Sequence, residues 1–255
     1  MGKNSSMSEL IRIFVGYDRR IPVAFQTLAH SITARSSKPV SFCPISLTNL
    51  DGLYMREVNP LQSTEFSFSR FFTPYLSNYE GWSLFMDNDI IAQDDIAKLW
   101  GLRDEKYAVM CVKHEHNPAE AEKFMHSAQT KYIKKNWSSV MLFNNAKCKK
   151  LTKEYVNTAS GLELHQFKWL DRDDLIGALP EKWNHLVDYS KGEKPALLHY
   201  TEGGPFYPDY ANCGYSAEWF REFADANFCA EADIFKLTEM AKAKLPEKLK
   251  EKCPS

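Results

Sequence analysis

Long hydrophobic runs and an excess of charge of either sign are both missing from this sequence. None of its 255 residues belongs to an uninterrupted apolar stretch of about 18 residues, so no membrane-spanning helix is predicted. Lys and Arg number 32 and Asp and Glu 33, which leaves a formal net charge of −1. Neutralising a phosphate backbone needs a clustered cationic excess, so this balance argues against a protein that mainly binds nucleic acid. It still allows a small anion held locally by a metal ion or an arginine.

Closely spaced cysteine pairs and a secretory signal are missing as well. The six cysteines are scattered without any CxxC pair, and a chain of this length can bury an adequate core without disulfides. We therefore expect reduced thiols and a cytoplasmic location. The polar start MGKNSSMSEL is unlike a secretory signal, and residues 1–9 are expected to form a flexible leader.

No internal repeat and no Gly/Ser-rich linker divides the chain. Together with 44% hydrophobic and 25% charged residues, this is typical of an ordinary globular protein. We expect one main domain over residues 10–215 and a helical extension over residues 216–255 that packs on it. The extension ends in KAKLPEKLKEKCPS, in which leucines are spaced among lysines. Such a basic tail could touch an anionic membrane surface weakly, or it could be a solvated terminus, which is the commoner case.

Short apolar runs separated by helical patterns predict an α/β sheet. LIRIFV, from Leu10, has the character of a buried strand, and VSFCPISL, from Val40, that of a second one. Between them, Pro22 suits the first turn of a helix, and apolar residues recur at helical spacing as far as Ile32. Strand, helix and strand in this order form the unit of a parallel sheet. Later apolar runs occupy residues 82–86, 107–112, 138–143 and 196–200.

The most informative segment is SLFMDNDIIAQDDIAKLW, in which an apolar run leads directly into Asp87, Asn88 and Asp89. Alternation along an extended chain places the two carboxylates on one side, with Asn88 facing away. Ligands collect where strands of an open α/β sheet end, and paired carboxylates suit Mg²⁺ or Mn²⁺. A polar turn is the alternative interpretation. Asp94 and Asp95 are more simply explained as a cap of the following helix.

Five segments, taken in order, resemble the glycosyltransferases with a GT-A fold, and most of all glycosyltransferase family 8 with its bacterial and viral relatives. Their order and spacing across roughly 200 residues give the resemblance its weight. It implies an α/β GT-A (nucleotide-diphospho-sugar transferase) fold with a mostly parallel central sheet flanked by helices, and makes residues 10–215 the catalytic domain. The segments are RIFVGYD (12–18), FSRFFTPYL (68–76), LFMDND (84–89), WSSVMLFN (137–144) and LLHYTEGGPF (197–206).

The chain also departs from the family pattern. Trp137 stands where the family normally has asparagine, and Ser139 where it has glycine. The late segment lacks the lysine that often binds the donor diphosphate. The family's acidic-glutamine-acidic segment is only faintly echoed by HQFKWLDRDD, at residues 165–174. The metal site therefore carries over better than the acceptor-binding or catalytic assignments.

The resemblance implies transfer of a sugar from a nucleotide-sugar donor, such as a UDP-sugar, to a glycan or another hydroxyl acceptor, with retention of the anomeric configuration. It makes His199 the third protein ligand of a cation held by Asp87 and Asp89. An imidazole ligand favours Mn²⁺ over Mg²⁺. Taken alone, His199 could equally be a strand-end histidine with local hydrogen bonds.

The resemblance also assigns donor-binding residues. Arg70 offers a planar fork for the diphosphate, with a surface salt bridge as the alternative. Tyr17 and Asp18 follow the first strand and could contact the nucleoside, and Asp18 could also cap the next helix. Gly203 and Gly204 would let backbone N–H groups approach the phosphates, or would form a tight turn. The predicted set is Gly16, Tyr17, Asp18, Arg70, Asp87, Asn88, Asp89, Ser138, Gly203 and Gly204.

The catalytic nucleophile belongs to the acceptor in such a reaction, so no catalytic triad is expected. Reaction with retention needs a polar group near the anomeric carbon. The candidates are Asp171, Gln166 and Asp173, each of which could instead be an ordinary loop or helix-surface residue. Flat aromatic rings suit sugar faces, which makes Trp183 and its neighbour Asn184 candidates for acceptor binding.

Cys111, His114 and His116 have the side-chain types of zinc ligands, but no second matching half accompanies them. An acceptor-binding role for His114 is therefore preferred over a second metal site.

The sequence leaves two alternatives to a metal-dependent glycosyltransferase. A nucleotidyltransferase can share the sheet and the acidic site, but it normally has a glycine-rich basic loop after the first strand, and GYDRR has one glycine. A catalytically silent carbohydrate-binding protein could keep the fold. The altered Trp137 and Ser139 and the missing lysine are the features that favour this second alternative.

Overall fold

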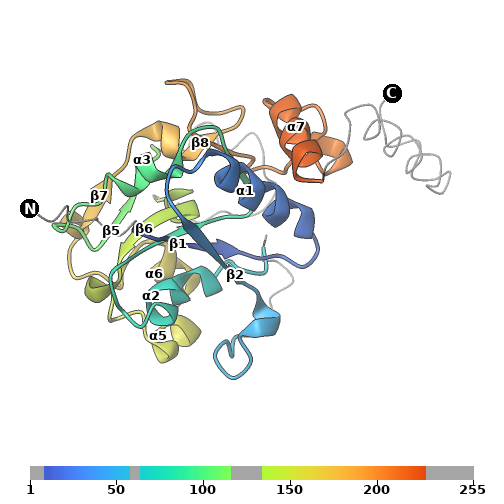
Figure 1. The fold of residues 1–255 in the computed structure, drawn as a ribbon. Coiled ribbons are helices and arrows are strands. Elements are labelled where there is room, and N and C mark those ends of the chain that lie inside the picture. Colours follow the sequence, from blue (N-terminus) through green and yellow to red (C-terminus); the bar gives the residue numbers. More distant parts are fainter. Residues whose placement is uncertain (1–8, 58–63, 116–133, 228–255) are drawn as a thin grey trace, which may run out of the picture.

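The computed structural model describes residues 9–57, 64–115 and 134–227 of the chain (Figure 1). Residues 1–8 of the predicted leader and residues 228–255 of the predicted extension, including its basic tail, lie outside the described ranges. Within these ranges, no helix combines the length and the apolar character that spanning a membrane requires.

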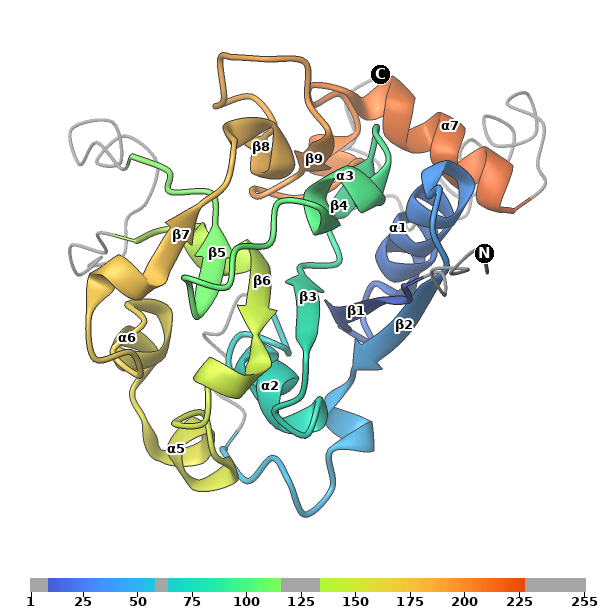
Figure 2. The same ribbon diagram turned by 60° about the vertical axis from the view of Figure 1, so that its left-hand side comes forward.

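A six-stranded sheet with the order β2-β1-β3-β6-β5-β7 forms the centre of the fold (Figure 2). The pairs β1–β2, β1–β3 and β5–β7 are parallel, whereas β6 runs antiparallel to both of its neighbours. The mostly parallel sheet expected from the sequence is thus confirmed, with one reversed strand. The strands are β1 (Ile11–Gly16), β2 (Val40–Ile45), β3 (Trp82–Met86), β5 (Val109–Cys111), β6 (Val140–Asn144) and β7 (Ile176–Ala178).

A second, three-stranded sheet has the order β4-β9-β8. Its strands are β4 (Ile90–Ala92), β8 (His185–Leu186) and β9 (Leu197–His199). The chain reaches β4 directly after β3, because it bends at residues 88 and 89 and leaves the first sheet there. The sequence predicted the apolar run of β9 but not its place in a separate sheet.

Helices cover both faces of the central sheet (Figures 1 and 2). Alternate residues of β1 point into different core clusters: Ile13 and Val15 pack with Leu28 of α1, and Phe14 packs with Phe71 and Leu164. This period of two is what a strand buried on both faces requires. The α-helices are α1 (Pro22–Arg35), α2 (Thr73–Leu76), α3 (Ile96–Trp100), α5 (Lys153–Thr158), α6 (Gly161–His165) and α7 (Ser216–Ala226).

Short 3₁₀ helices connect many of these elements. They are η1 (Leu47–Asn49), η2 (Ser69–Phe72), η3 (Trp137–Ser139), η4 (Asn145–Lys147), η5 (Asp173–Leu175), η6 (Glu181–Asn184) and η7 (Pro208–Tyr210).

Two helix starts predicted from the sequence are confirmed. Pro22 is the first residue of α1, where its missing N–H removes no helical hydrogen bond. Asp95 is the N-cap of α3, and its carboxylate accepts a hydrogen bond of 2.9 Å from the Ala97 N–H.

Helix α7 lies alongside α1 in both views (Figures 1 and 2), and a buried carboxylate joins the two helices. Glu222 of α7 is 3% exposed, and its two oxygens lie 2.6 Å from His30 Nδ1 and 2.7 Å from Arg35 Nη2 of α1. At the end of the pair, Gln26 donates to the side chain of Asn227. Burial of Glu222 depends on these partners, because an ionised carboxylate in the interior must be paired.

We predict that Glu222→Ala lowers the free energy of unfolding by about 1.5–3 kcal/mol, the range for hydrogen bonds to charged groups. Asp225→Ala, at an exposed position of the same helix, is the control and should change stability by less than about 0.5 kcal/mol. Urea unfolding of both variants measures the difference. Equal stabilities would contradict the assignment of Glu222 as the link between α1 and α7.

Candidate functional site

Asp87, Asp89 and His199 converge where the two sheets meet. One ligand atom from each residue lies within 4.8 Å of the others, and no other such group of His, Cys, Asp or Glu occurs among the described residues. The backbone sets this arrangement: β4 pairs with β9 so that Ile90 is opposite His199, and the Tyr200 N–H donates to the Asp89 carbonyl at 2.9 Å. The bend after β3 therefore delivers both carboxylates to the end of β9.

The charges of this cluster are poorly compensated by the protein itself. Burial raises the pKa of Asp87 to about 6, and the neighbouring Asp89 adds to the rise, while Arg70 and His199 oppose it. Burial would lower the pKa of His199, but Asp89 and Asp87 raise it above its ordinary value. Asp89 Oδ1 is buried without a hydrogen-bond partner among the described residues and lies 3.4 Å from His199 Nε2. Two carboxylates, an imidazole and an unsatisfied buried oxygen fit a divalent cation.

Arg70 contacts this cluster through Asp87 and is 5% exposed. Its Nη1 is 2.8 Å from Asp87 Oδ1 and donates to the Ser138 carbonyl at 2.9 Å, and its guanidinium lies 5.3 Å from the ring centres of both Phe66 and Phe85. The alternative of a surface salt bridge is wrong, since the ion pair is buried. What the structure shows is a cation that fixes Asp87, and contact of Arg70 with a donor stays a prediction.

Ser138, a predicted donor-binding residue, is buried and engaged from two sides. Its carbonyl accepts from Arg70, and its Oγ is 2.8 Å from His165 Nδ1. His165 also packs edge-on against Phe71, with ring centres 5.1 Å apart. Burial, with a further contribution from the Arg70 charge, lowers the pKa of His165 to about 3. His165 is therefore neutral in the folded protein at physiological pH.

We predict that His165 makes the protein less stable in acid. Its folded pKa of about 3 lies below the unfolded value of 6.5, so the unfolded chain binds the extra proton between these pH values and stability falls as pH falls from 6.5 toward 3. A fully titrating group contributes at most about 1.4 kcal/mol per pH unit in this window. His165→Gln should reduce the pH slope of the free energy of unfolding, measured by urea titrations from pH 7 to about pH 4. An unchanged slope would contradict the prediction, whatever the absolute stability of the variant.

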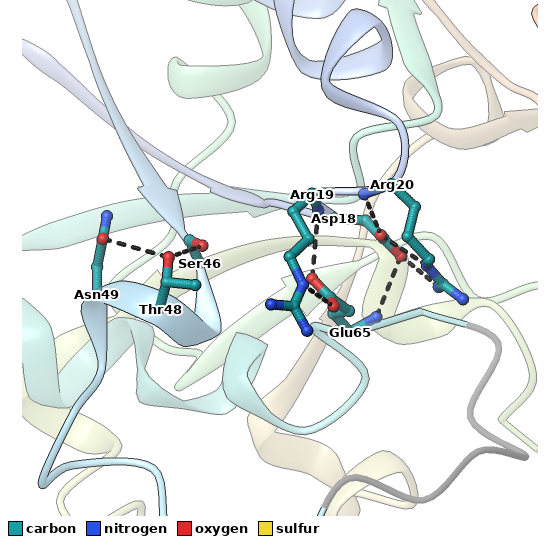
Figure 3. Close-up of polar contacts among 7 residues, drawn as sticks. All are labelled: Asp18, Arg19, Arg20, Ser46, Thr48, Asn49 and Glu65. Carbon is teal, nitrogen blue, oxygen red and sulfur yellow. Dashed lines mark hydrogen bonds and ion pairs between the residues drawn. The ribbon is translucent and has the colours of Figure 1, made fainter.

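Asp18 lies directly after β1, 1% exposed, and both of its oxygens are engaged (Figure 3). It accepts from Arg20 N at 3.0 Å, from Arg20 Nε at 2.8 Å and from Glu65 N at 3.3 Å. Burial alone would raise the pKa of Asp18, but these hydrogen bonds hold it below its ordinary value. The alternative of a helix cap is wrong, because Ile21 occupies the N-cap position of α1 and no side chain caps that helix.

The same sheet edge carries polar side chains that the sequence analysis missed (Figure 3). After β2, Ser46 Oγ and Thr48 Oγ1 are 2.8 Å apart, and Thr48 Oγ1 lies 3.4 Å from Asn49 Oδ1. Arg19 Nε donates to Glu65 at 2.7 Å. Their position after β2 could have predicted this, because the carboxyl ends of adjacent parallel strands share one edge of a sheet.

The hydroxyl of Tyr207 is sensitive to the charge of Asp18 and to that of Asp89. Burial raises the pKa of this hydroxyl, and the charges of Asp18 and Asp89 add to this rise while Arg20 opposes it. Tyr17, predicted to contact a nucleoside, packs edge-on against Phe25 with ring centres 5.6 Å apart.

The predicted glycines are required by packing. A Cβ on Gly16 would lie 2.2 Å from the Phe66 ring, and one on Gly204 would lie 2.1 Å from the Phe206 ring. Gly203 has φ +151° and donates to the Tyr200 carbonyl at 3.0 Å. These contacts agree with the tight-turn alternative for residues 203–204, and a role in phosphate binding stays a prediction.

The predicted catalytic residues are only partly brought together. Lys134, which is 7% exposed, donates to Asp173 Oδ1 at 2.8 Å and to the Gln166 carbonyl at 3.1 Å. Lys134 holds the pKa of Asp173 below its ordinary value. Asp171 is exposed and takes no part in this contact. The buried Lys134 was missed because its sequence context, YIKKN, has the character of a solvated charged stretch.

The predicted acceptor-binding pair lies in the interior. Trp183 is 1% exposed and belongs to the core, which leaves no ring face for a sugar. Asn184 is fully buried, with Oδ1 2.9 Å from His199 Nδ1 and Nδ2 donating to the Asn136 carbonyl at 3.0 Å. Both acceptor-binding predictions are therefore corrected: Trp183 supports the fold, and Asn184 contacts a member of the acidic cluster.

His114 is half-buried, and its Nε2 is buried without a hydrogen-bond partner among the described residues. Burial, with a contribution from His199, lowers its pKa to about 4. Its carbonyl accepts from Trp137 Nε1 at 2.9 Å. Cys111 is fully buried, and burial raises the pKa of its thiol to about 12, while His116 lies outside the described ranges.

Asn88 lies between the two carboxylates and was expected to face away from them. It is buried, and its Nδ2 has no hydrogen-bond partner among the described residues.

Comparison with solved structures defines the class of the protein as a GT-A-like glycosyltransferase fold. The bifunctional glycosyltransferase WbbM aligns with a TM-score of 0.56 at 15% identity, over 92% of this chain and 52% of WbbM. GlyE of Streptococcus pneumoniae TIGR4 aligns with 0.55 at 15% identity, over 93% and 65%. LgtC, in complex with donor and acceptor sugar analogs, gives 0.53 at 14% identity, over 93% and 98%. The chain thus spans about half of WbbM and less than two thirds of GlyE.

The sequence comparisons define the family. The model of glycosyl transferase family 8 matches residues 36–203, and the chain belongs to this family. It is also 46% identical to Protein CDI of Arabidopsis thaliana over 233 residues, which cover 88% of this chain and 90% of that protein. The family suggested by the five sequence segments is confirmed.

Proposed function

We propose that this protein is a metal-dependent glycosyltransferase that moves a sugar from a UDP-sugar to a hydroxyl of a glycan or another acceptor, with retention. The observation that carries the proposal is the convergence of Asp87, Asp89 and His199 within 4.8 Å at the ends of β3 and β9. Membership of family 8 supports glycosyl transfer and argues against the nucleotidyltransferase alternative. The donor and acceptor sugar analogs in the LgtC structure support the same two partner classes here.

The three side chains would hold Mn²⁺ in preference to Mg²⁺, because one of them is an imidazole. A bound divalent cation supplies stabilisation of the negative charge that develops on the leaving diphosphate. The fold positions the three side chains that would bind the cation. Arg70 fixes Asp87 by its contact of 2.8 Å, and the pairing of β4 with β9 fixes Asp89 beside His199.

We also propose a domain division and a cellular location for the protein. Residues 10–215 form the catalytic domain, and the extension from residue 216 is joined to it through Glu222 of α7. The described cysteines Cys43, Cys111, Cys148 and Cys213 are all free, which favours a reducing, cytoplasmic location.

Calorimetry with UDP tests the donor site. In the parent protein, Mn²⁺ should strengthen UDP binding, because a cation held by Asp87, Asp89 and His199 would supply positive charge for the diphosphate. Asp89→Asn keeps the shape of the side chain but removes one anionic ligand, so we expect it to lose about 10-fold or more of this enhancement. Asp51→Asn, in an exposed turn, is the matched control and should bind as the parent does.

UDP binding that ignores both Mn²⁺ and Asp89→Asn would overturn the metal-bridged donor site. Turnover is tested separately by release of UDP from a panel of UDP-sugars in the presence of Mn²⁺. If UDP and Mn²⁺ bind as expected but no UDP-sugar is turned over, the catalytically silent binding protein is the correct alternative.

Arg20 is the cation that we assign to the donor diphosphate. The late segment has no lysine for this task, and Arg70 is buried against Asp87. Arg20 follows β1 at the same sheet edge, its side chain is 58% exposed, and Asp18 orients it through Nε and Nη2 (Figure 3). Its charge acts on Tyr207, which also responds to Asp89. Arg20 is thus an exposed, oriented cation at the sheet edge where the donor is proposed to bind.

We predict that Arg20→Gln weakens UDP binding in the presence of Mn²⁺ by about 10- to 100-fold, because a charge-assisted contact contributes about 1.5–3 kcal/mol. Uridine, which has no phosphate, should bind Arg20→Gln and the parent equally. The control is Arg19→Gln, at the adjacent arginine that pairs with Glu65. Equal losses for UDP and uridine would show that Arg20 acts only by holding Asp18.

A further inference from the structure

Asn184 is the one predicted acceptor-binding residue that the structure connects directly to the acidic cluster. It is the last residue of η6, is fully buried, and uses both ends of its amide. Oδ1 lies 2.9 Å from His199 Nδ1, and Nδ2 donates to the Asn136 carbonyl at 3.0 Å. The second contact fixes which end of the amide is which, since a carbonyl accepts hydrogen bonds and does not donate them.

The orientation of the amide determines the tautomer of His199. Because Oδ1 is an acceptor, the ring nitrogen facing it must carry the proton, so neutral His199 has its hydrogen on Nδ1. The lone pair is then on Nε2, the nitrogen that lies 3.4 Å from Asp89 Oδ1. Nε2 is thus available to a cation held by Asp87 and Asp89, and the ring cannot turn without breaking the bond to Asn184.

The Asn136–Ser139 turn also holds the other side of the cluster. The Ser139 carbonyl accepts from the Asp87 N–H at 2.9 Å, and the Ser138 carbonyl accepts from Arg70, which contacts Asp87. Asn136 itself has φ 62°, a left-handed conformation that asparagine tolerates better than most residues. One short turn therefore aligns Asp87 through its later residues and His199 through Asn184.

We propose that Asn184 is a positioning residue for the metal site: its side chain, braced by the Asn136 carbonyl, holds His199 in the Nδ1–H tautomer so that Nε2 faces the cation. This inference rests on the proposed function only for the identity of the ligand. The state of the ring itself can be measured on the metal-free protein. Partners that orient a ligating histidine in this way typically contribute 10–100-fold to metal affinity.

Two substitutions separate positioning from mere support of the fold. Asn184→Leu has nearly the same volume but neither hydrogen bond, and Asn184→Asp keeps the acceptor for Nδ1–H. The chain offers a matched control in Asn145, which is also fully buried and donates through Nδ2 to Ser83 Oγ and the Glu80 carbonyl. Asn145→Leu removes a buried amide of the same kind at the other end of β6, away from Asp87.

The first measurement is Mn²⁺ binding alone, followed by calorimetry or electron paramagnetic resonance. Asn184→Leu should raise the Kd for Mn²⁺ by about 10–100-fold, whereas Asn145→Leu should bind within a few-fold of the parent. The second measurement is ¹⁵N NMR of metal-free protein at a pH high enough that the His199 signals no longer change with pH, because neighbouring carboxylates raise the pKa of His199. His199 should be the Nδ1–H tautomer in the parent, in Asn184→Asp and in Asn145→Leu, but a mixture in Asn184→Leu.

An unchanged Kd and tautomer in Asn184→Leu would overturn the proposal. If Asn184→Leu fails to fold, the tautomer in Asn184→Asp decides it: this variant keeps the acceptor for Nδ1–H, so a mixture of tautomers in it would overturn the proposal. A metal-free parent with its proton on Nε2 would also overturn it. A parent that shows the Nδ1–H tautomer but binds no Mn²⁺ would instead contradict the proposed function, so the two failures are distinguishable.

Discussion

The site depends on one constraint: two negatively charged carboxylates have to lie close together where water is largely excluded. Asp87 and Asp89 are separated by one residue, and their ligand atoms lie within 4.8 Å of each other and of His199. Repulsion and desolvation both favour the neutral form of a buried carboxyl group, and the raised pKa of Asp87 is the result. The surrounding structure has to hold the two side chains together against this, with Arg70 as the nearby fixed cation.

Backbone hydrogen bonds do most of the work of holding Asp87 and Asp89 close to His199. The bend after β3 brings Asp89 under β9, and the Tyr200 N–H donates to the Asp89 carbonyl. The Ser139 carbonyl accepts from the Asp87 N–H at the end of the β3–β6 pairing. Because β6 is antiparallel to β3, the residues that precede β6 lie beside those that follow β3. The one reversed strand of the central sheet is thus what places the 136–139 turn beside Asp87.

The sequence predicts local features well and side-chain environments poorly. The strands, the start of α1 and the Asp95 cap follow from periodicity and capping chemistry, which are local. The convergence of Asp87, Asp89 and His199 came from the family resemblance, because pairing of β4 with β9 joins residues far apart in the chain. The roles of Asn184, Lys134 and Glu222 were missed or misassigned. Each is a polar side chain buried by tertiary contacts, and no sequence period distinguishes such a residue from a solvated one.

The departures from the family pattern at Trp137 and Ser139 take on a different meaning once their contacts are known. These substitutions were the main sequence feature favouring a silent binding protein. The turn, however, acts on Asp87, Arg70 and Asn184 through three backbone carbonyls, those of Asn136, Ser138 and Ser139. Any residue that keeps the turn can supply a carbonyl, and the Trp137 side chain points its Nε1 to the carbonyl of His114 instead. A changed side chain at these positions therefore leaves the backbone support of Asp87, Arg70 and Asn184 intact.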